Sequence, residues 1–258
     1  MSNPFRLFID LNKKCFEVIA KIFPQTKYDP PHNASAYYTE AVKKNLADGC
    51  TILDVGGGRQ WEFHEERKRF SNMKVIALDI SEEQLRCNHD ADEKILFAMG
   101  TDERAPLDDN SVDLVTSTMV LEHIENNDYT MREVFRVLKP GGKFISVMPN
   151  KFSIFSTINR ILPYKLARNI LLTLKPDFKG ISGFKAYYDR TYYSGMKKLL
   201  NKYGFSEIDF GLSYSQSEYF SFFLPFALIV LVWDFIMYMF RIKPLCSYVC
   251  FVAVKKKQ

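Results

Sequence analysis

Five short runs of apolar and β-branched residues recur between residues 51 and 148, with amphipathic segments between them. The runs cover residues 51–55, 74–79, 94–99, 112–119 and 143–148. Segments in which apolar residues have helical spacing lie between the runs, at 62–70, 82–88 and 129–138. Strands that alternate with helices predict a parallel, doubly wound α/β sheet.

The pattern changes after residue 150. Residues 151–190 contain eight Lys and Arg against two Asp and show no regular period, so an irregular segment is predicted there. A helix at 192–203 and strands at 205–212 and 247–255 are expected to follow. Between those two strands, residues 219–240 form an apolar run of 22 residues whose one charged side chain is Asp234.

Apolar residues near the N-terminus also recur with helical spacing, between residues 5 and 23. Four basic residues lie between them: Arg6, Lys13, Lys14 and Lys21. The spacing predicts an amphipathic helix, which either contacts a membrane or packs on the protein's own core. A secretory signal is not expected, because charges interrupt the segment and no small-residue cleavage site follows. Three prolines then predict a linker before a second helix at 34–47.

Composition narrows the class of protein. The 258 residues are 47% hydrophobic and 25% charged, which excludes wholesale disorder, collagen and coiled coil. Five cysteines without a Cys-x-x-Cys pair argue against a disulfide framework and a Cys-based zinc site. A reducing, cytosolic compartment and the absence of a bound metal are therefore expected.

Charge is divided unevenly along the chain. Residues 1–128 contain 15 Lys and Arg against 23 Asp and Glu, a net charge of −8. Residues 129–258 contain 20 against 7, a net charge of +13. The basic residues of the second half are interleaved with Phe, Leu and Ile, which favours an anionic membrane surface over nucleic acid. A plain solvated face is the other interpretation.

A glycine turn and two successive strand ends carry the candidate chemistry. The sequence TILDVGGGRQ places Asp54 at a strand end, directly before a turn that lets a ligand approach the backbone. A dinucleotide fingerprint needs a glycine where this chain has Trp61, so NAD and FAD are disfavoured. Asp79 ends the next strand, where a carboxylate accepts both hydroxyls of a ribose. Asp102 follows the third strand and suits the amino group of a base.

The stretch from about residue 37 to residue 149 resembles the class I S-adenosylmethionine-dependent methyltransferases of the small-molecule type. The matching segments stand in the family's order: LDVGGG (53–58), ALDIS (77–81), MGTDERAPLDDNSVDLV (99–115), MVLEHIEN (119–126) and EVFRVLKPGGKFI (133–145). The resemblance implies a Rossmann-like, seven-stranded doubly wound sheet and S-adenosyl-L-methionine as cofactor. One departure is Gln60, which stands where the family often has a glycine.

The resemblance also implies which residues bind the cofactor. They are Asp54, Gly56, Gly57 and Gly58 for the methionine part, Asp79 for the ribose, Thr101 and Asp102 for the adenine region, and Met119 for the pocket lining. Ile80, directly after Asp79, is also expected to contact the cofactor. In the alternative interpretation Asp54 and Asp79 only cap the glycine turn and the next helix, and Asp102 belongs to a solvated acidic loop.

Glu122 and His123 are the catalytic candidates, because they follow the fourth strand, next to the expected place of the methyl group. Histidine is suited to general-base chemistry near pH 7. Methyl transfer often needs only positioning, so the alternative is that both residues support the site through hydrogen bonds.

The same resemblance bears on the apolar run at 219–240. In this family the last two strands form a hairpin, and a helix spanning the membrane between them would separate them by about 30 Å of hydrocarbon. Pro225 and Asp234 also interrupt the run. One or two helices lying in the membrane interface are therefore predicted, with a helical lid packed on the domain as the alternative.

The expected organisation is an N-terminal amphipathic helix and linker at 1–33 and a methyltransferase domain at 34–258. Within that domain, residues 151–190 form a substrate-side insertion and residues 213–246 an apolar, membrane-associating insertion.

The sequence thus predicts a methyltransferase of a lipid-like or lipid-linked acceptor, peripheral or monotopic at the cytoplasmic face of a membrane. One alternative is a methyltransferase of a soluble metabolite with an apolar lid or dimer interface. A second is a catalytically silent binding module. No nucleic-acid partner is expected, and the accepting atom and oligomeric state stay open.

Overall fold

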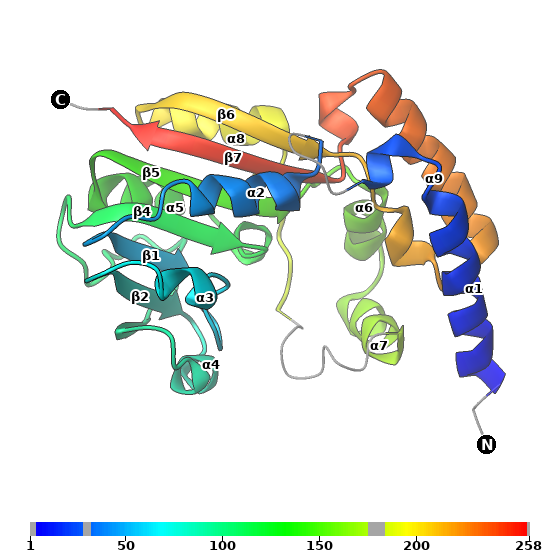
Figure 1. Cartoon of the computed structure of the whole chain (residues 1–258), viewed down its shortest axis with the longest axis horizontal. Coiled ribbons are helices and arrows are strands. Elements are labelled where there is room, and N and C mark those ends of the chain that lie inside the picture. Colours follow the sequence, from blue (N-terminus) through cyan, green and yellow to red (C-terminus); the bar gives the residue numbers. More distant parts are fainter. Residues whose placement is uncertain (1–3, 28–31, 175–183, 257–258) are drawn as a thin grey trace.

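The computed structural model describes residues 4–27, 32–174 and 184–256. Seven strands form one sheet in the order β3-β2-β1-β4-β5-β7-β6 (Figure 1). The strands are β1 (Thr51–Val55), β2 (Lys74–Asp79), β3 (Glu93–Leu96), β4 (Val112–Thr118), β5 (Leu138–Pro149), β6 (Phe205–Ser213) and β7 (Tyr248–Lys255). Only β7 runs antiparallel to its neighbours, β5 and β6. The predicted doubly wound, seven-stranded α/β sheet is confirmed.

Helices cover both faces of the sheet. Helix α2 (Ala34–Lys43) packs on β5, β6 and β7, whereas α5 (Asn127–Val137) and α8 (Tyr193–Lys202) lie on the opposite face (Figure 1). Two short helices, α3 (His64–Arg67) and α4 (Glu82–Cys87), follow β1 and β2. The predicted helix at 62–70 is therefore a single turn. Two separate groups of buried apolar residues fill the two interfaces between sheet and helices.

Capping side chains fix where several helices begin. Asn33 accepts hydrogen bonds from the backbone at the start of α2, and Ser81 does so for α4. Asn126 caps α5 in the same way, by accepting from Asp128 N at 3.0 Å. Short polar side chains of this kind satisfy the free N–H groups of a first helical turn. They therefore make the chain turn into a helix soon after it leaves the sheet.

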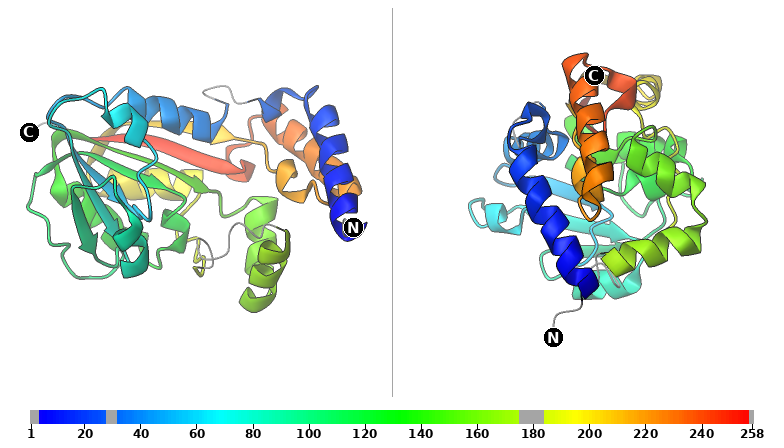
Figure 2. Two further views of the ribbon diagram at one scale, coloured as in Figure 1. Left: turned by 60° about the horizontal axis from the view of Figure 1, so that its bottom comes forward. Right: turned by 90° about the vertical axis from the view of Figure 1, so that its right-hand side faces the viewer.

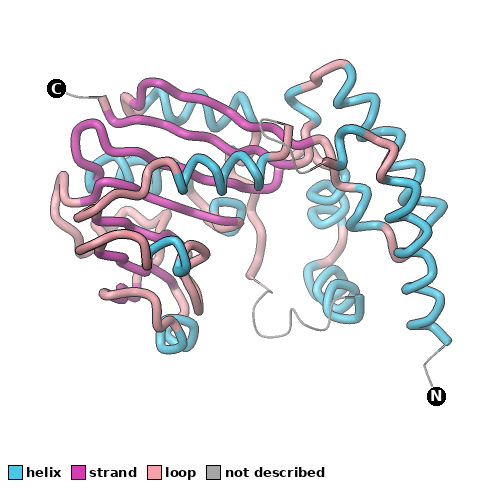
Figure 3. The backbone as a smooth tube through the Cα atoms, viewed as in Figure 1, coloured by secondary structure: helices cyan, strands magenta, loops and turns pink. Residues whose placement is uncertain are grey.

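A second group of helices lies beyond the carboxyl ends of the parallel strands, and we call it the accessory lobe. It consists of α1 (Pro4–Ala20), α6 (Ile154–Ile161), α7 (Tyr164–Leu174), the 3-10 turn η4 (Ser217–Phe220) and α9 (Leu224–Met239). Figure 3 shows that these helices stand apart from the strands. Helices α1 and α9 pack side by side, as both views in Figure 2 show.

The accessory lobe has a small core of its own. Its fully buried members are Phe16, Ala20, Phe220, Ala227, Val230 and Leu231. The prediction that residues 151–190 are irregular is wrong for 154–174, which form α6 and α7. Ile154, Phe155 and Ile158 of α6 have helical spacing and pack against this core. Residues 175–183 of the predicted insertion lie outside the described residues.

The apolar run at 219–240 forms one α-helix after a 3-10 turn. Pro225 lies in the first turn of α9, where proline is tolerated, so it begins the helix rather than interrupting it. With 16 residues, α9 is about 24 Å long. Within the described ranges, no helix is both long enough and apolar enough to cross a membrane.

Buried polar side chains hold the accessory lobe together. Asp234 of α9 accepts from the backbone N of Gln216 at 2.8 Å and of Ser217 at 2.9 Å, and from Gln216 Nε2 at 3.1 Å. Gln216 Oε1 in turn accepts from Phe155 N at 3.1 Å. Asn12 Oδ1 of α1 accepts from Leu224 N at 2.9 Å. Three helices are thus tied together by side-chain bonds to backbone groups.

Replacing Asp234 by Ala is expected to lower the free energy of unfolding by about 2–4 kcal/mol, because several buried donors lose their acceptor. Asp234→Asn keeps one acceptor oxygen and should cost less. Urea denaturation measures both, with the exposed Asp10→Ala as the matched control. If Asp234→Ala and Asp10→Ala unfold at the same urea concentration, the proposed tie does not contribute.

Candidate active site

The predicted cofactor residues meet at the carboxyl edge of the sheet. Strands β1, β2 and β4 are mutually parallel neighbours, so their carboxyl ends reach the same edge. Asp54 of β1 stands in register with Ala77 of β2 and Thr116 of β4. In Figure 1 these strands point toward the accessory lobe. The edge where a ligand would bind therefore faces the lobe.

The glycine turn is closely packed against the segments around it. Gly56 has a φ of +77°, and a Cβ there would come within 2.2 Å of Val120 Cγ2. A Cβ on Gly57 would come within 2.9 Å of the Ala77 side chain. Only glycine fits these two places. The turn is therefore pressed against the segment that follows β4.

Asp54 lies in a group of three acids, of which Asp54 and Asp79 are buried and Glu62 is more exposed. Thr116 Oγ1 donates to Asp54 Oδ1 at 2.7 Å. Burial is nevertheless the main cause that raises the pKa of Asp54 to about 7, and the charges of Glu62 and Asp79 contribute to this rise. Glu62 Oε2 accepts from Thr118 Oγ1 at 3.2 Å, and burial raises the pKa of Glu62 as well. Three carboxyl groups gathered beside a glycine turn favour a cationic ligand.

Asp79 accepts hydrogen bonds from the backbone around the turn, and its carboxylate has further acceptor positions for a ligand. Its two carboxylate oxygens accept from Gly58 N at 3.0 Å and from Ser81 N at 2.8 Å. A carboxylate has about four acceptor positions, so two remain for hydroxyl groups. The next residue, Ile80, is 57% exposed. This apolar side chain at a strand end could pack against a flat ring of the cofactor.

The predicted adenine region lies beside the same edge. Gly100 has a φ of +87°, and a Cβ there would come within 2.4 Å of Ile124. This places the loop after β3 against the segment after β4. Thr101 Oγ1 donates to Ala98 O at 3.1 Å. Asp102 Oδ1 accepts from Arg132 Nη1 at 2.7 Å, so this exposed carboxylate already has a cationic partner. Its role toward adenine stays a prediction.

Met119 marks the turn that leaves β4. It is in the left-handed region with a φ of +54°, and its N donates to Val147 O at 2.9 Å. Its side chain is partly buried against the core under α2. An uncommon backbone conformation directly after β4 redirects the chain toward Glu122 and His123.

Glu122 and His123 lie in the short 3-10 turn η2 (Leu121–His123). Glu122 Oε1 and His123 Nε2 are 3.9 Å apart. The Glu122 side chain is buried, which raises its pKa to about 8, so the carboxyl group is mostly protonated at pH 7. Burial lowers the pKa of His123. His123 Nδ1 lies 3.1 Å from Lys185 O. Since a carbonyl only accepts, Nδ1 carries the proton and Nε2 keeps its lone pair.

The structure brings together most of the predicted residues and adds others. Asp54, the three glycines and Asp79 form one connected group, and the segments that carry Met119, Thr101 and His123 pack beside it. Glu62 and Thr118 were not predicted. Glu62 has no motif that identifies it, since its place depends on how the chain after the glycine turn folds back onto β4.

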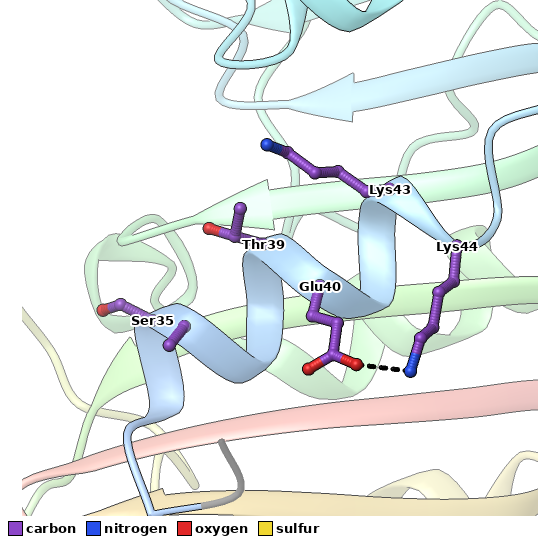
Figure 4. Close-up of a pocket in the computed structure, with 6 residues that line it drawn as sticks. Ser35, Thr39, Glu40, Lys43 and Lys44 are labelled. Atoms are coloured by element: carbon purple, nitrogen blue, oxygen red, sulfur yellow. Dashed lines mark ion pairs between the residues drawn. The ribbon is translucent and has the colours of Figure 1, made fainter. Parts of the chain in front are cut away.

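A hollow elsewhere on the surface has none of these features. It lies on α2 and is lined by Ser35, Ala36, Thr39, Glu40, Lys43 and Lys44 (Figure 4). Lys44 forms an ion pair with Glu40 within it, and Lys43 Nζ pairs with Glu66 Oε1 at 2.6 Å. All lining residues belong to one helix, so the hollow is a helix surface rather than a cleft between elements.

The sequence comparisons agree with this geometry. Residues 53–146 match the family described as "Methyltransferase domain". The ubiquinone/menaquinone biosynthesis C-methyltransferase UbiE of Hahella chejuensis is 30% identical over 114 residues, which are 40% of this chain and 44% of that protein. UbiE of Idiomarina loihiensis is 24% identical over 163 residues, which are 57% of this chain and 64% of that protein. The matches cover less than two thirds of either relative.

Solved structures extend the likeness to most of the fold. Phosphoethanolamine N-methyltransferase 2 of Haemonchus contortus, in complex with S-adenosyl-L-methionine, has a TM-score of 0.53 at 17% identity, over 86% of this chain and 52% of that one. Geranyl diphosphate C-methyltransferase of Streptomyces coelicolor has a TM-score of 0.54 at 13% identity, over 86% and 79% of the two chains. At these identities the likeness establishes the fold.

The fold is that of the class I S-adenosylmethionine-dependent methyltransferases, and residues 53–146 match the model of a methyltransferase domain. The acidic residues around the glycine turn fit S-adenosyl-L-methionine, which carries a sulfonium and an ammonium group.

Asp79→Ala is expected to abolish tight binding of S-adenosyl-L-methionine. The ribose hydroxyls lose a charged acceptor worth about 1.5–3 kcal/mol, and the glycine turn and the start of α4 each lose one hydrogen bond. Calorimetric titration measures the effect, with the exposed Asp48→Ala as control. Unchanged affinity in Asp79→Ala, or tighter binding of NAD than of S-adenosyl-L-methionine by the wild type, would remove the ribose assignment.

The affinity for S-adenosyl-L-methionine is expected to rise with pH through about 7. A cationic ligand stabilises the ionised form of Asp54, so binding lowers its pKa from about 7 and releases a proton. Below pH 7 each unit of acidification should weaken binding by about tenfold at most. Calorimetry in two buffers of different ionisation enthalpy counts the released protons. Asp54→Asn should lose this dependence, and a dissociation constant unchanged between pH 5.5 and 8 would contradict the coupling.

Proposed function

We propose that the protein transfers a methyl group from S-adenosyl-L-methionine to a lipid-like or lipid-linked small molecule at a membrane surface. The observation that carries the proposal is a large exposed apolar face on the lobe next to the cofactor edge. In this proposal the protein is a peripheral or monotopic protein at the cytoplasmic face of a membrane. Bound S-adenosyl-L-methionine supplies an electrophilic methyl group, and the electron pair of its S–CH3 bond returns to sulfur on transfer.

The outward face of α9 supports membrane contact. Its exposed large apolar residues are Ile229, Val232, Trp233, Ile236, Met239 and Phe240. They lie opposite the buried stripe that contains Ala227 and Asp234, and Ile229 is 67% exposed. An exposed apolar face of this kind is typical of surfaces that bind a membrane or a partner.

Helix α1 presents a similar stripe. Leu7, Leu11 and Val18 recur at intervals of four and seven residues, on a different side from its buried Ile9, Phe16 and Ala20. One side of the helix packs on α9, and the other side, apolar and exposed, supports the proposed membrane contact. Basic residues lie within α1 or just after the two helices and suit anionic head groups: Arg6, Lys13, Lys14, Lys21, Arg241 and Lys243.

The comparisons support an apolar acceptor. The relatives are named for ubiquinone and menaquinone biosynthesis, and one structural neighbour was solved with geranyl diphosphate. The matched part of this chain contains the cofactor edge, whereas the accessory lobe lies largely outside residues 53–146. The acceptor is therefore inferred mainly from this chain's own lobe.

His123 is assigned the role of general base. Its Nε2 has a free lone pair, and burial keeps the ring neutral near pH 7 by lowering its pKa. The accepting atom forms its bond to the methyl carbon, and the proton that it loses passes to His123 Nε2. Buried Glu122, 3.9 Å away, positions the ring within the site.

His123→Ala is expected to lower turnover by about 10²–10⁴-fold while leaving the affinity for S-adenosyl-L-methionine nearly unchanged. Transfer of labelled methyl groups to a total lipid extract measures turnover, and His89→Ala, outside the site, serves as control. A loss below about tenfold would assign His123 to structural support.

Ile229→Glu and Ile236→Glu are expected to release the protein from vesicles of mixed neutral and anionic lipid, since each places a charge in the apolar contact. Flotation with vesicles measures binding, and Leu96→Glu, a matched change of an exposed residue on β3, should leave it intact. High salt should release only part of the wild type, because it screens charge but not apolar contact.

Two outcomes would redirect the proposal. Wild-type protein that stays with the soluble fraction and sediments as a dimer would favour the apolar face as a dimer interface and a soluble acceptor. Cofactor binding without transfer to any lipid or soluble fraction would favour the silent module.

A further inference from the structure

A group of buried and partly buried polar side chains lies where the accessory lobe meets the sheet. Its members are Glu122, Tyr188, Tyr219 and Tyr248. The Glu122 side chain is 4% exposed, and its Oε2 has no hydrogen-bond partner among the described residues. An unpartnered buried oxygen is costly, so such an atom in a native site is a candidate for contact with a ligand.

Four separate parts of the chain contribute to this group. Tyr248 begins β7 and stands opposite Pro149 at the carboxyl end of β5. Tyr219 lies in η4 of the accessory lobe, with its ring 4.4 Å from that of Phe155. Tyr188 N donates to Glu122 O at 3.0 Å, which places the segment after the described gap directly on η2. The group therefore lies between the cofactor edge and the lobe.

The tyrosines interact with one another and with Glu122. Asn159 Nδ2 donates to Tyr188 Oη at 3.1 Å. Tyr219 and Tyr248 share a side-chain hydrogen bond. Burial is the main cause that raises the pKa of all three phenols, and the nearby Glu122 raises each of them further. All three tyrosines are therefore neutral hydroxyl groups at physiological pH.

Within the described part of the chain, His123 is the basic side chain beside this group, and its ring is neutral; no Lys or Arg acts on the group. None of the causes that shift the pKa of Glu122 or of the three phenols is a Lys or an Arg. Nearby cations have other partners: Lys185 Nζ lies over the Tyr187 ring and Arg190 pairs with Asp128. A phosphate or other anionic head would need charged donors, which this group does not supply.

We propose that Glu122, Tyr219 and Tyr248 form a neutral polar subsite that takes the hydroxyl or carbonyl oxygen of an uncharged acceptor head. Tyr188 completes the wall of the subsite. This inference rests on the proposed function and deepens it, because it separates acceptors such as hydroquinones and phenols from phosphate-bearing lipids. The apolar part of the acceptor extends toward the lobe, and the oxygen-bearing part reaches the cofactor edge.

A matched pair of probes tests the subsite by binding alone, without vesicles. Decyl hydroquinone and its monophosphate are titrated into the full-length protein saturated with S-adenosylhomocysteine. The wild type should bind decyl hydroquinone at least about tenfold more tightly than the monophosphate. Tyr219→Phe and Tyr248→Phe should each weaken hydroquinone binding by about 3- to 10-fold, the effect of one lost hydrogen bond, with unchanged affinity for S-adenosylhomocysteine.

Tyr193→Phe removes a hydroxyl from α8 and is the control for these variants. Equal or tighter binding of the monophosphate overturns the subsite, as does hydroquinone binding that is absent or indifferent to both substitutions. If the hydroquinone titration contradicts the subsite, the flotation assay of vesicle binding through α9 is unaffected. If the protein does not bind vesicles, the titration can still be interpreted, because it contains no vesicles. The subsite and the proposed membrane function therefore fail separately.

Discussion

The return of the last strand into the sheet is the constraint on which the rest of the structure depends. Strand β7 lies between β5 and β6 and runs antiparallel to both, so the segment between β6 and β7 must begin and end at one place. Ser213 is the register partner of Tyr248, and Ser247 N donates to Ser213 O at 2.7 Å. An apolar segment closed in this way folds back as η4 and α9, beyond the carboxyl ends of the parallel strands. The accessory lobe therefore lies beside the cofactor edge.

The lobe combines polar bonds inside with apolar side chains outside. Asn12 and Asp234 bind backbone groups of neighbouring elements, and Gln25 Nε2 donates to Leu231 O at 3.2 Å. These hydrogen bonds join the helices at defined places. The helices are therefore held together without all of their apolar surface being buried between them. Much of that surface, on α9 and α1, is left exposed. An exposed apolar face on this helix pair therefore remains next to the site.

The features that the sequence predicted best are those set by residues close together in the chain, such as the bounds of strands. Strands β1 and β2 have their predicted bounds, because each apolar run ends at an acid, Asp54 or Asp79, that begins a turn. Helices α6 and α7 were missed because basic residues obscured their helical spacing, and because the core on which α6 packs comes from α1, η4 and α9, far away in the chain. Glu62 and the tyrosine group could not be predicted, since only the folded chain brings their separate segments together. Pro225 was misjudged because its effect depends on whether it begins a helix or lies inside one.

Membrane contact through α9 is the central claim, and the two tryptophans give a direct measurement of it. Trp61 is 1% exposed in the core, whereas Trp233 is 38% exposed on the outward face of α9. Fluorescence is recorded on adding vesicles that contain brominated lipids, which quench tryptophans within the acyl region. The account predicts a blue shift and quenching that disappear in Trp233→Phe and persist in Trp61→Phe. Emission from Trp233 that is unchanged by vesicles to which the protein binds would contradict it.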